Sequence, residues 1–138
     1  MKIALLTAAA FLALTPAAFA EVQTYKADLK ASSEVPANDS KGSGALTATY
    51  DTTSKKLTYS ATYKDLTGPA TMAHFHGPAA AGTNAGVVVP VKEMTPSPLK
   101  GEATLTDDQA KQLADGMMYF NVHTAANKGG EIRGQVTK

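Results

Sequence analysis

The chain has 138 residues, contains no cysteine and carries a formal net charge of +1. A single domain of this length can bury enough apolar surface for a core without covalent cross-links, and a chain without thiols has neither disulfides nor thiolate metal ligands. The near-neutral charge provides no basic surface of the kind that binds nucleic acid.

The first twenty residues have the layout of a secretory signal peptide. Lys2 is their only charge, an apolar run covers residues 3–14, and the segment ends on small residues at 18–20. The run is shorter than the roughly 20 residues that span a bilayer. We therefore expect cleavage before Glu21, leaving residues 21–138 as a periplasmic or secreted domain with a net charge of zero and no membrane attachment.

Beyond the signal peptide, short alternating segments are separated by loops rich in Gly, Pro, Ser, Thr and Asn. Residues 45–50 and 56–63 are rich in Thr and Tyr and predict a hairpin. Pro90 lies in an apolar run and confines that strand to a sheet edge or a bulge. The predicted strands cover residues 21–29, 45–50, 56–63, 72–76, 87–91, 99–105, 117–124 and 130–137.

One helix is predicted between the last strands. Thr106 and Gln109 form a capping-box pattern at its start, and Gly116 marks its end. Its apolar stripe is modest, which suits a helix that lies across one end of a sheet. About eight strands with one short helix favour an all-β fold, either an antiparallel Greek-key sandwich or a flattened barrel.

All three histidines fall on one predicted sheet face. The segments 72–76, 119–123 and 131–136 each alternate, so every second side chain points to the same side. The apolar set on one side is Phe75, Phe120, Val122, Ile132 and Val136. The polar set on the other side is His74, His76, Tyr119, Asn121, His123, Glu131, Arg133 and Gln135.

This arrangement predicts a metal or small-ligand site. His74 and His76 should lie about 6–7 Å apart along one strand, and His123 from another strand would supply a third nitrogen. Three imidazoles suit one copper or zinc ion, and intrinsic affinity favours copper. A water molecule, Glu131 or a thioether would complete the ligand set. The candidate thioethers are Met72, Met117 and Met118.

The same residues also allow a site without metal. The histidines could each hydrogen-bond a covering loop at residues 77–86, with Tyr119 and Asn121 supporting them in a buried polar network. Glu131 is then either a ligand or the partner of Arg133 in an ion pair that orients the histidines. For Arg133 the ion pair is the preferred interpretation.

Several motifs resemble the CHRD domain, the module repeated in chordin and found singly in many exported bacterial proteins. They are His74-Phe75-His76-Gly77-Pro78, Gly86-Val87-Val88-Val89, Tyr119-Phe120-Asn121-Val122-His123-Thr124 and Gly130-Glu131-Ile132-Arg133-Gly134-Gln135, with Glu34-Val35-Pro36 upstream. The resemblance covers essentially all of residues 21–138 and implies an extracytoplasmic β domain. It brings no settled biochemical activity.

A weaker similarity is to copper/zinc superoxide dismutases, Greek-key barrels with a His-x-His strand, a later histidine and a Gly-Gly-x-Arg segment. His74, His76, His123 and Arg133 match in kind and order. The chain departs from those enzymes in having no bridging histidine, no histidines for a separate zinc subsite and no disulfide.

The sequence thus predicts an exported binding module whose partner is a metal ion or small ligand at His74, His76 and His123, and it favours binding over catalysis without deciding between them. One alternative is a copper redox enzyme related to superoxide dismutase, in which Arg133 steers an anion. The other is a metal-free structural or interaction domain with an extracellular protein partner.

Overall fold

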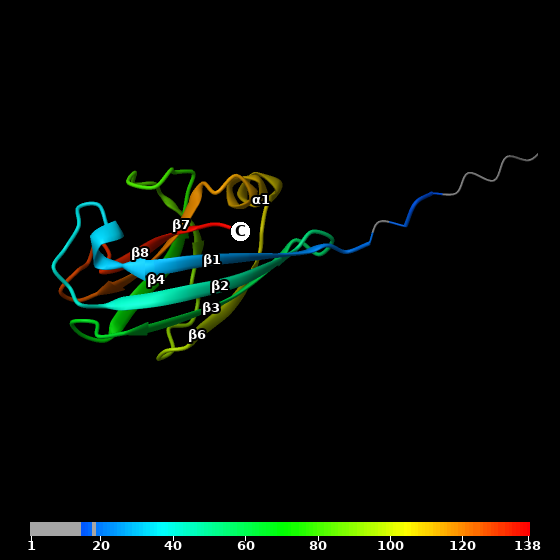
Figure 1. The fold of residues 1–138 in the computed structure, drawn as a ribbon. Coiled ribbons are helices and arrows are strands. Elements are labelled where there is room, and N and C mark those ends of the chain that lie inside the picture. Colours follow the sequence, from blue (N-terminus) through cyan, green and yellow to red (C-terminus); the bar gives the residue numbers. More distant parts are fainter. Residues whose placement is uncertain (1–14, 18) are drawn as a thin grey trace, which may run out of the picture.

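Eight strands form one antiparallel sheet that curves into a nearly closed barrel (Figure 1). The computed structural model describes residues 15–17 and 19–138, so most of the predicted signal peptide lies outside the described residues. The helical elements are η1 (Ala31–Ser33) and α1 (Asp107–Ala114). The strands are β1 (Val22–Lys30), β2 (Ser43–Asp51), β3 (Lys56–Lys64), β4 (Ala70–His76), β5 (Val87–Pro90), β6 (Leu99–Thr104), β7 (Met118–Thr124) and β8 (Ile132–Val136).

The strand order is β5-β4-β7-β8-β1-β2-β3-β6, which confirms the all-β prediction. The strand that contains Pro90 lies at one edge, as the missing backbone N–H requires. The predicted Thr- and Tyr-rich hairpin is β2 with β3. β7 lies between β4 and β8, and this order brings the three histidine-face segments side by side although they are far apart in the sequence.

The inner face of the barrel holds the core. The Phe75 and Phe120 rings pack edge to face with centroids 4.9 Å apart, and Tyr59 packs on Phe75 at 5.1 Å. Aromatic pairs of this geometry contribute about 0.5–1.5 kcal/mol beyond the burial of their area. The apolar set predicted from the alternation is fully buried in this core: Phe75, Phe120, Val122, Ile132 and Val136.

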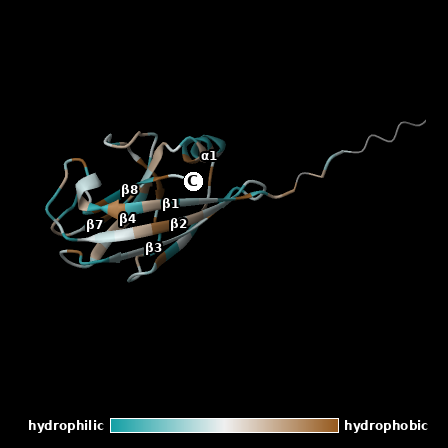
Figure 2. Cartoon of the chain, viewed as in Figure 1, coloured by the Kyte–Doolittle hydropathy of each residue, from teal (hydrophilic) through white to brown (hydrophobic). Residues whose placement is uncertain are grey.

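The predicted capping box of α1 is confirmed, and it also ties the helix to the sheet. The Gln109 backbone N–H donates to Thr106 Oγ1 at 3.2 Å, and Gln109 Oε1 accepts from the Thr106 N–H at 3.0 Å. Gln109 Nε2 then donates to the Val88 carbonyl of edge strand β5 at 2.9 Å. The helix is largely hydrophilic in Figure 2, and Leu113 is its buried residue. None of the helices in the described part of the chain has the length and apolar character needed to span a bilayer.

Candidate metal centre

The three histidines lie on the outer face of β4 and β7, opposite the core. His74 pairs with Asn121 across the two strands, and His76 pairs with Tyr119. His123 is two residues beyond Asn121 on β7, so it lies on the same face and diagonal to His74. The strand order therefore places the third histidine beside the His-x-His pair, as the sequence predicted.

The imidazole rings converge on one region. His74 Nδ1 lies 3.1 Å from His123 Nε2, and one ring nitrogen from each of the three histidines lies within 4.8 Å of the other two. A tetrahedral zinc ion with Zn–N bonds of about 2.0–2.1 Å holds its nitrogens roughly 3.3 Å apart. His74 and His123 already have that separation, and His76 lies close enough to join them by a small side-chain movement.

Two backbone carbonyls determine which ring nitrogens carry protons. His76 Nδ1 lies 2.9 Å from the Ala85 carbonyl oxygen, and His123 Nδ1 lies 2.9 Å from that of Lys128. A carbonyl oxygen can only accept, so both Nδ1 atoms are the donors. In the neutral form that ligates metals, each ring has a single N–H, so its lone pair then lies on Nε2. Histidine ligands of metals are commonly oriented by such contacts.

Asn121 Oδ1 lies 3.0 Å from Nε2 of His76 and 3.0 Å from Nε2 of His123. Its amide nitrogen lies near the buried Glu34 carboxyl. The oxygen and nitrogen of an amide exchange places by a half-turn of the side chain, and in that orientation the Asn121 NH₂ donates to the two Nε2 lone pairs. The contacts therefore suit either a hydrogen-bonded network without metal or a site in which the Nε2 atoms ligate an ion.

The rings are held in the form that binds metals. Burial, together with the neighbouring His123 and His76, lowers the pKa of His74 to about 4. Burial also lowers the pKa of His76, against the effect of its hydrogen bonds to Ala85 and Asn121. Both rings are therefore neutral at pH 7, and neutral imidazole is the ligating form.

The loop between β4 and β5 covers one side of the site. The Tyr119 ring stacks on His76 with centroids 4.7 Å apart, and its hydroxyl accepts from the Ala85 N–H at 3.1 Å. The Arg133 guanidinium lies 3.4 Å from the Tyr119 ring centroid and donates to Asn84 Oδ1 at 2.7 Å and to the Thr83 carbonyl. Arg133 thus fastens the predicted roof loop above His76.

We expect Arg133→Lys to loosen this roof. A lysine has no planar fork and cannot bond both Thr83 and Asn84 while stacking on Tyr119. Amide hydrogen exchange over residues 79–86 should become about tenfold faster, since losing one charge-assisted hydrogen bond lowers the free energy of local opening by about 1.5 kcal/mol. Exchange in the β2–β3 hairpin should stay unchanged. Equal acceleration in both regions would contradict a local role for Arg133.

Glu131 is engaged elsewhere. Its carboxylate is fully buried and accepts four hydrogen bonds, from Ser40 Oγ, Thr124 Oγ1 and both the N–H and Oγ1 of Thr67, at 2.5–2.8 Å. Burial alone would raise its pKa, but these hydrogen bonds lower the pKa to about 2. None of them comes from a histidine or from Arg133, and the described residues form no Glu131–Arg133 ion pair. Glu131 anchors two loops to β8.

Sequence reasoning gave no role to Glu34, which the structure places beneath the site. Its side chain is only 5% exposed, and Oε1 has no hydrogen-bond partner among the described residues. Burial raises the pKa of Glu34 to about 7, against the opposing effects of Arg133 and Asn121. Gly130 makes room for it, since a Cβ there would lie 2.3 Å from Glu34 Oε1. The sequence signal was the Glu34-Val35-Pro36 motif.

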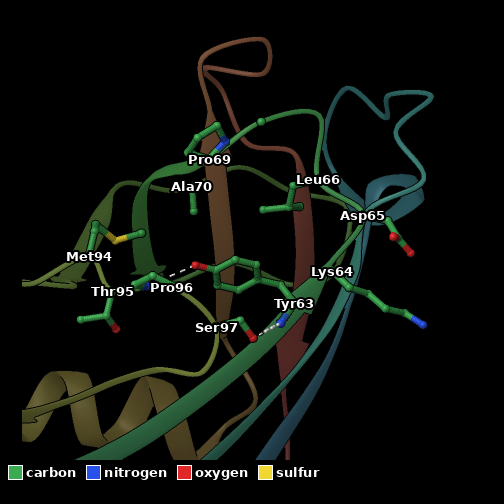
Figure 3. A pocket seen from close by; sticks show the side chains of 11 residues that line it. Tyr63, Lys64, Asp65, Leu66, Pro69, Ala70, Met94, Thr95, Pro96 and Ser97 are labelled. Atoms are coloured by element: carbon green, nitrogen blue, oxygen red, sulfur yellow. Dashed lines mark hydrogen bonds between the residues drawn. The ribbon is translucent and has the colours of Figure 1, made fainter.

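A cavity of about 430 Å³ lies away from the histidines, between the β3–β4 connection and residues 94–97 (Figure 3). Tyr63 lies across its centre, with its hydroxyl donating to the Thr95 carbonyl at 3.1 Å and its backbone N–H donating to Ser97 Oγ at 3.0 Å. Its walls include Leu66 and Met94 but no histidine. The cavity is thus separate from the candidate metal centre.

Comparison with known proteins agrees with this arrangement of motifs. The family model of the CHRD domain matches residues 25–136, a span that includes η1, α1 and all three histidines. The chain belongs to the CHRD domain family. No curated protein and no solved structure matches the chain, so the weaker similarity to superoxide dismutases gains no support. In this CHRD domain, the motifs that carry the resemblance are the strands and loops that surround the histidines.

Proposed function

We propose that this CHRD domain is an exported metal-binding module that holds one copper or zinc ion through His74, His76 and His123. Three imidazoles form a donor set that suits Cu(II) and Zn(II), and a nitrogen-rich site favours copper. The signal-peptide pattern of residues 1–20 and the CHRD family support export to the periplasm or the medium, with residues 21–138 as the mature domain.

The observation that carries the proposal is the convergence of three imidazoles, with one ring nitrogen from each within 4.8 Å of the other two. Nε2 of His76 and Nε2 of His123 each lie 3.0 Å from Asn121 Oδ1, and the carbonyls of Ala85 and Lys128 hold the protons on the opposite ring nitrogens. With the protons on Nδ1, the Nε2 lone pairs are the ligating atoms of His76 and His123, and His74 Nδ1 lies 3.1 Å from His123 Nε2.

Glu34 and Asn121 would act behind the ligands. The Asn121 side chain lies 3.0 Å from both Nε2 atoms and next to the buried Glu34 carboxyl, so Asn121 would help to position the two ligands. His76 and His123 have their second nitrogens fixed by backbone carbonyls, an outer-shell arrangement whose loss typically costs about 10- to 100-fold in metal affinity. Half-buried His74 is the ligand nearest solvent and gives the ion a route in.

Metal titration tests the proposal. Native mass spectrometry of the purified protein with Cu(II) or Zn(II) should show one ion per chain. Free metal at about 100 times its dissociation constant should stabilise the fold by about 2.7 kcal/mol, which raises the melting temperature on the order of 10 °C.

The matched variant is the double substitution His74→Ala, His123→Ala. His74→Ala alone is the milder change, because the His74 side chain makes no hydrogen bond to a backbone atom among the described residues. Both variants should lose most of the metal-induced stabilisation while the metal-free forms stay folded by circular dichroism. Equal melting shifts in the wild type and the double variant would remove the proposed site.

A further inference from the structure

We infer that Met72 supplies a thioether ligand to the site, so that the site takes Cu(I) as well as divalent ions. This inference rests on the proposed function, since it needs the three histidines to bind a metal. It adds the identity of the fourth protein ligand and the oxidation state of the preferred ion. The observations that carry it are strand register, exposure and the engagement of the competing donors.

Met72 lies opposite His123 in the register of β4 and β7. Residues directly opposite in an antiparallel pair have Cβ atoms about 4.5–5.5 Å apart. Met72 also precedes His74 by two residues on the same face of β4, about 6–7 Å along the strand. It is therefore next to both histidines whose nitrogens approach to 3.1 Å.

The side chain of Met72 is available for an ion. It is 48% exposed, among the most exposed large apolar side chains in the described residues, and it lies on the side of the site away from the roof loop. Methionine has three rotatable bonds and a polarisable sulfur, so it can swing toward the His74–His123 pair at low cost. A methionine on the surface is not by itself evidence of a site. Met72 is singled out by its register, which places it opposite His123 and two residues from His74.

The other candidate donors are engaged elsewhere. Met118 is fully buried in the core, and Met117 lies beyond Tyr119, at the far end of the histidine face. Both carboxylate oxygens of Glu131 accept hydrogen bonds from Ser40, Thr67 and Thr124. Of the thioethers and the carboxylate considered from the sequence, Met72 is the one that the fold leaves beside the imidazoles.

A thioether changes which ion the site prefers. Thioether sulfur is a soft ligand that selects Cu(I), whereas Zn(II) is well served by imidazole and oxygen. Three imidazole nitrogens and one exposed thioether thus form a mixed set that accommodates copper in both oxidation states. We expect Met72 to contribute strongly to Cu(I) binding and little to Zn(II) binding.

Cu(I) affinity of the purified protein tests the inference, measured anaerobically by competition with bicinchoninate. Met72→Leu conserves volume and lies on the surface, so the metal-free melting temperature should not change. It should weaken Cu(I) binding by about tenfold or more, and change Zn(II) binding by less than about twofold. Met94→Leu is the matched control, because Met94 lines the separate cavity in Figure 3. X-ray absorption of the Cu(I) form should show a sulfur ligand that Met72→Leu removes.

The outcomes separate the two proposals. Equal Cu(I) affinities in the wild type and Met72→Leu, or a wild type that binds Zn(II) and Cu(II) but not Cu(I), would overturn the role of Met72 and leave the histidine site standing. A wild type that binds none of these ions would overturn both.

Discussion

Replacing Glu131 by glutamine is expected to lower the free energy of unfolding by about 3 kcal/mol at pH 7, without loss of metal binding. The carboxylate has no exposed surface and accepts four hydrogen bonds from Ser40, Thr67 and Thr124. Glutamine removes the charge and turns an NH₂ donor toward hydroxyl and amide donors. Urea unfolding measures the loss.

The pH dependence of stability has a defined sign. The pKa of Glu131 falls from the ordinary value of 4.5 to about 2 in the folded protein, which corresponds to a stabilisation of about 3 kcal/mol. A lowered pKa stabilises the fold fully above pH 4.5, and this stabilisation is lost as the pH falls toward 2. The difference in stability between the wild type and Glu131→Gln should therefore shrink over this range, while contributions from other groups cancel.

Glu102→Gln provides the control for Glu131→Gln. Glu102 pairs with Lys56 at 3.1 Å, but its side chain is 63% exposed, and exposed ion pairs contribute about 0–1 kcal/mol. If Glu131→Gln were as mild as Glu102→Gln and abolished metal binding instead, Glu131 would be a ligand and its anchoring role would be wrong.

Gly134→Ala is expected to destabilise the protein by about 3 kcal/mol, because β8 packs too closely against β1 for any side chain at this position. A Cβ on Gly134 would lie 2.2 Å from the Asp28 carbonyl oxygen and 2.8 Å from its carbon. Both are backbone atoms of β1, so the clash can be relieved only by moving a strand and not by rotating a side chain. The displaced β8 carries Arg133, so the roof loop should also loosen.

Gly129→Ala is the matched control for the crowding at Gly134. Gly129 lies in the turn between β7 and β8, and a Cβ there meets no atom within 4 Å. The free energy of unfolding of the Gly129→Ala protein should differ from that of the wild type by less than about 1 kcal/mol. We expect a small gain in stability, because alanine restricts the unfolded chain more than glycine does. Thermal unfolding of both variants gives the comparison. Equal melting temperatures would contradict the close approach of β8 and β1.

Alternation along single strands was enough to predict which face each side chain takes. Phe75, Phe120 and Val122 are in the core because they alternate with His74, His76 and His123, and a register slip would reverse both sets. Pro90 and the Thr106 capping box also act through local backbone chemistry, so they could be read directly from the chain. The neighbouring position of β4 and β7 followed from pattern and resemblance.

The polar partners that the sequence analysis did not identify come from distant loops. Glu131 alternates with Ile132, as expected for a residue on the histidine face. Its carboxylate instead accepts hydrogen bonds from the hydroxyls of Ser40 and Thr67. The hydrogen bond from His76 to Ala85 is of the kind expected for the metal-free alternative, in which the histidines bond the covering loop at residues 77–86. The Lys128 carbonyl that orients His123 and the buried Glu34 lie in irregular segments, where no periodicity indicates direction. Loop folding therefore decided the tautomers, which are central to the metal proposal.

Histidine ring ¹⁵N spectra test the central claim most directly. In the metal-free protein at pH 7, Nδ1 of His76 and Nδ1 of His123 should be protonated and both Nε2 atoms should be bare, as the Ala85 and Lys128 carbonyls require. One equivalent of Zn(II) should shift the ¹⁵N signal of an unprotonated nitrogen in each of the three rings, and further Zn(II) should cause no further change. Rings protonated at Nε2, or signals unmoved by the metal, would show that these imidazoles do not form a metal site.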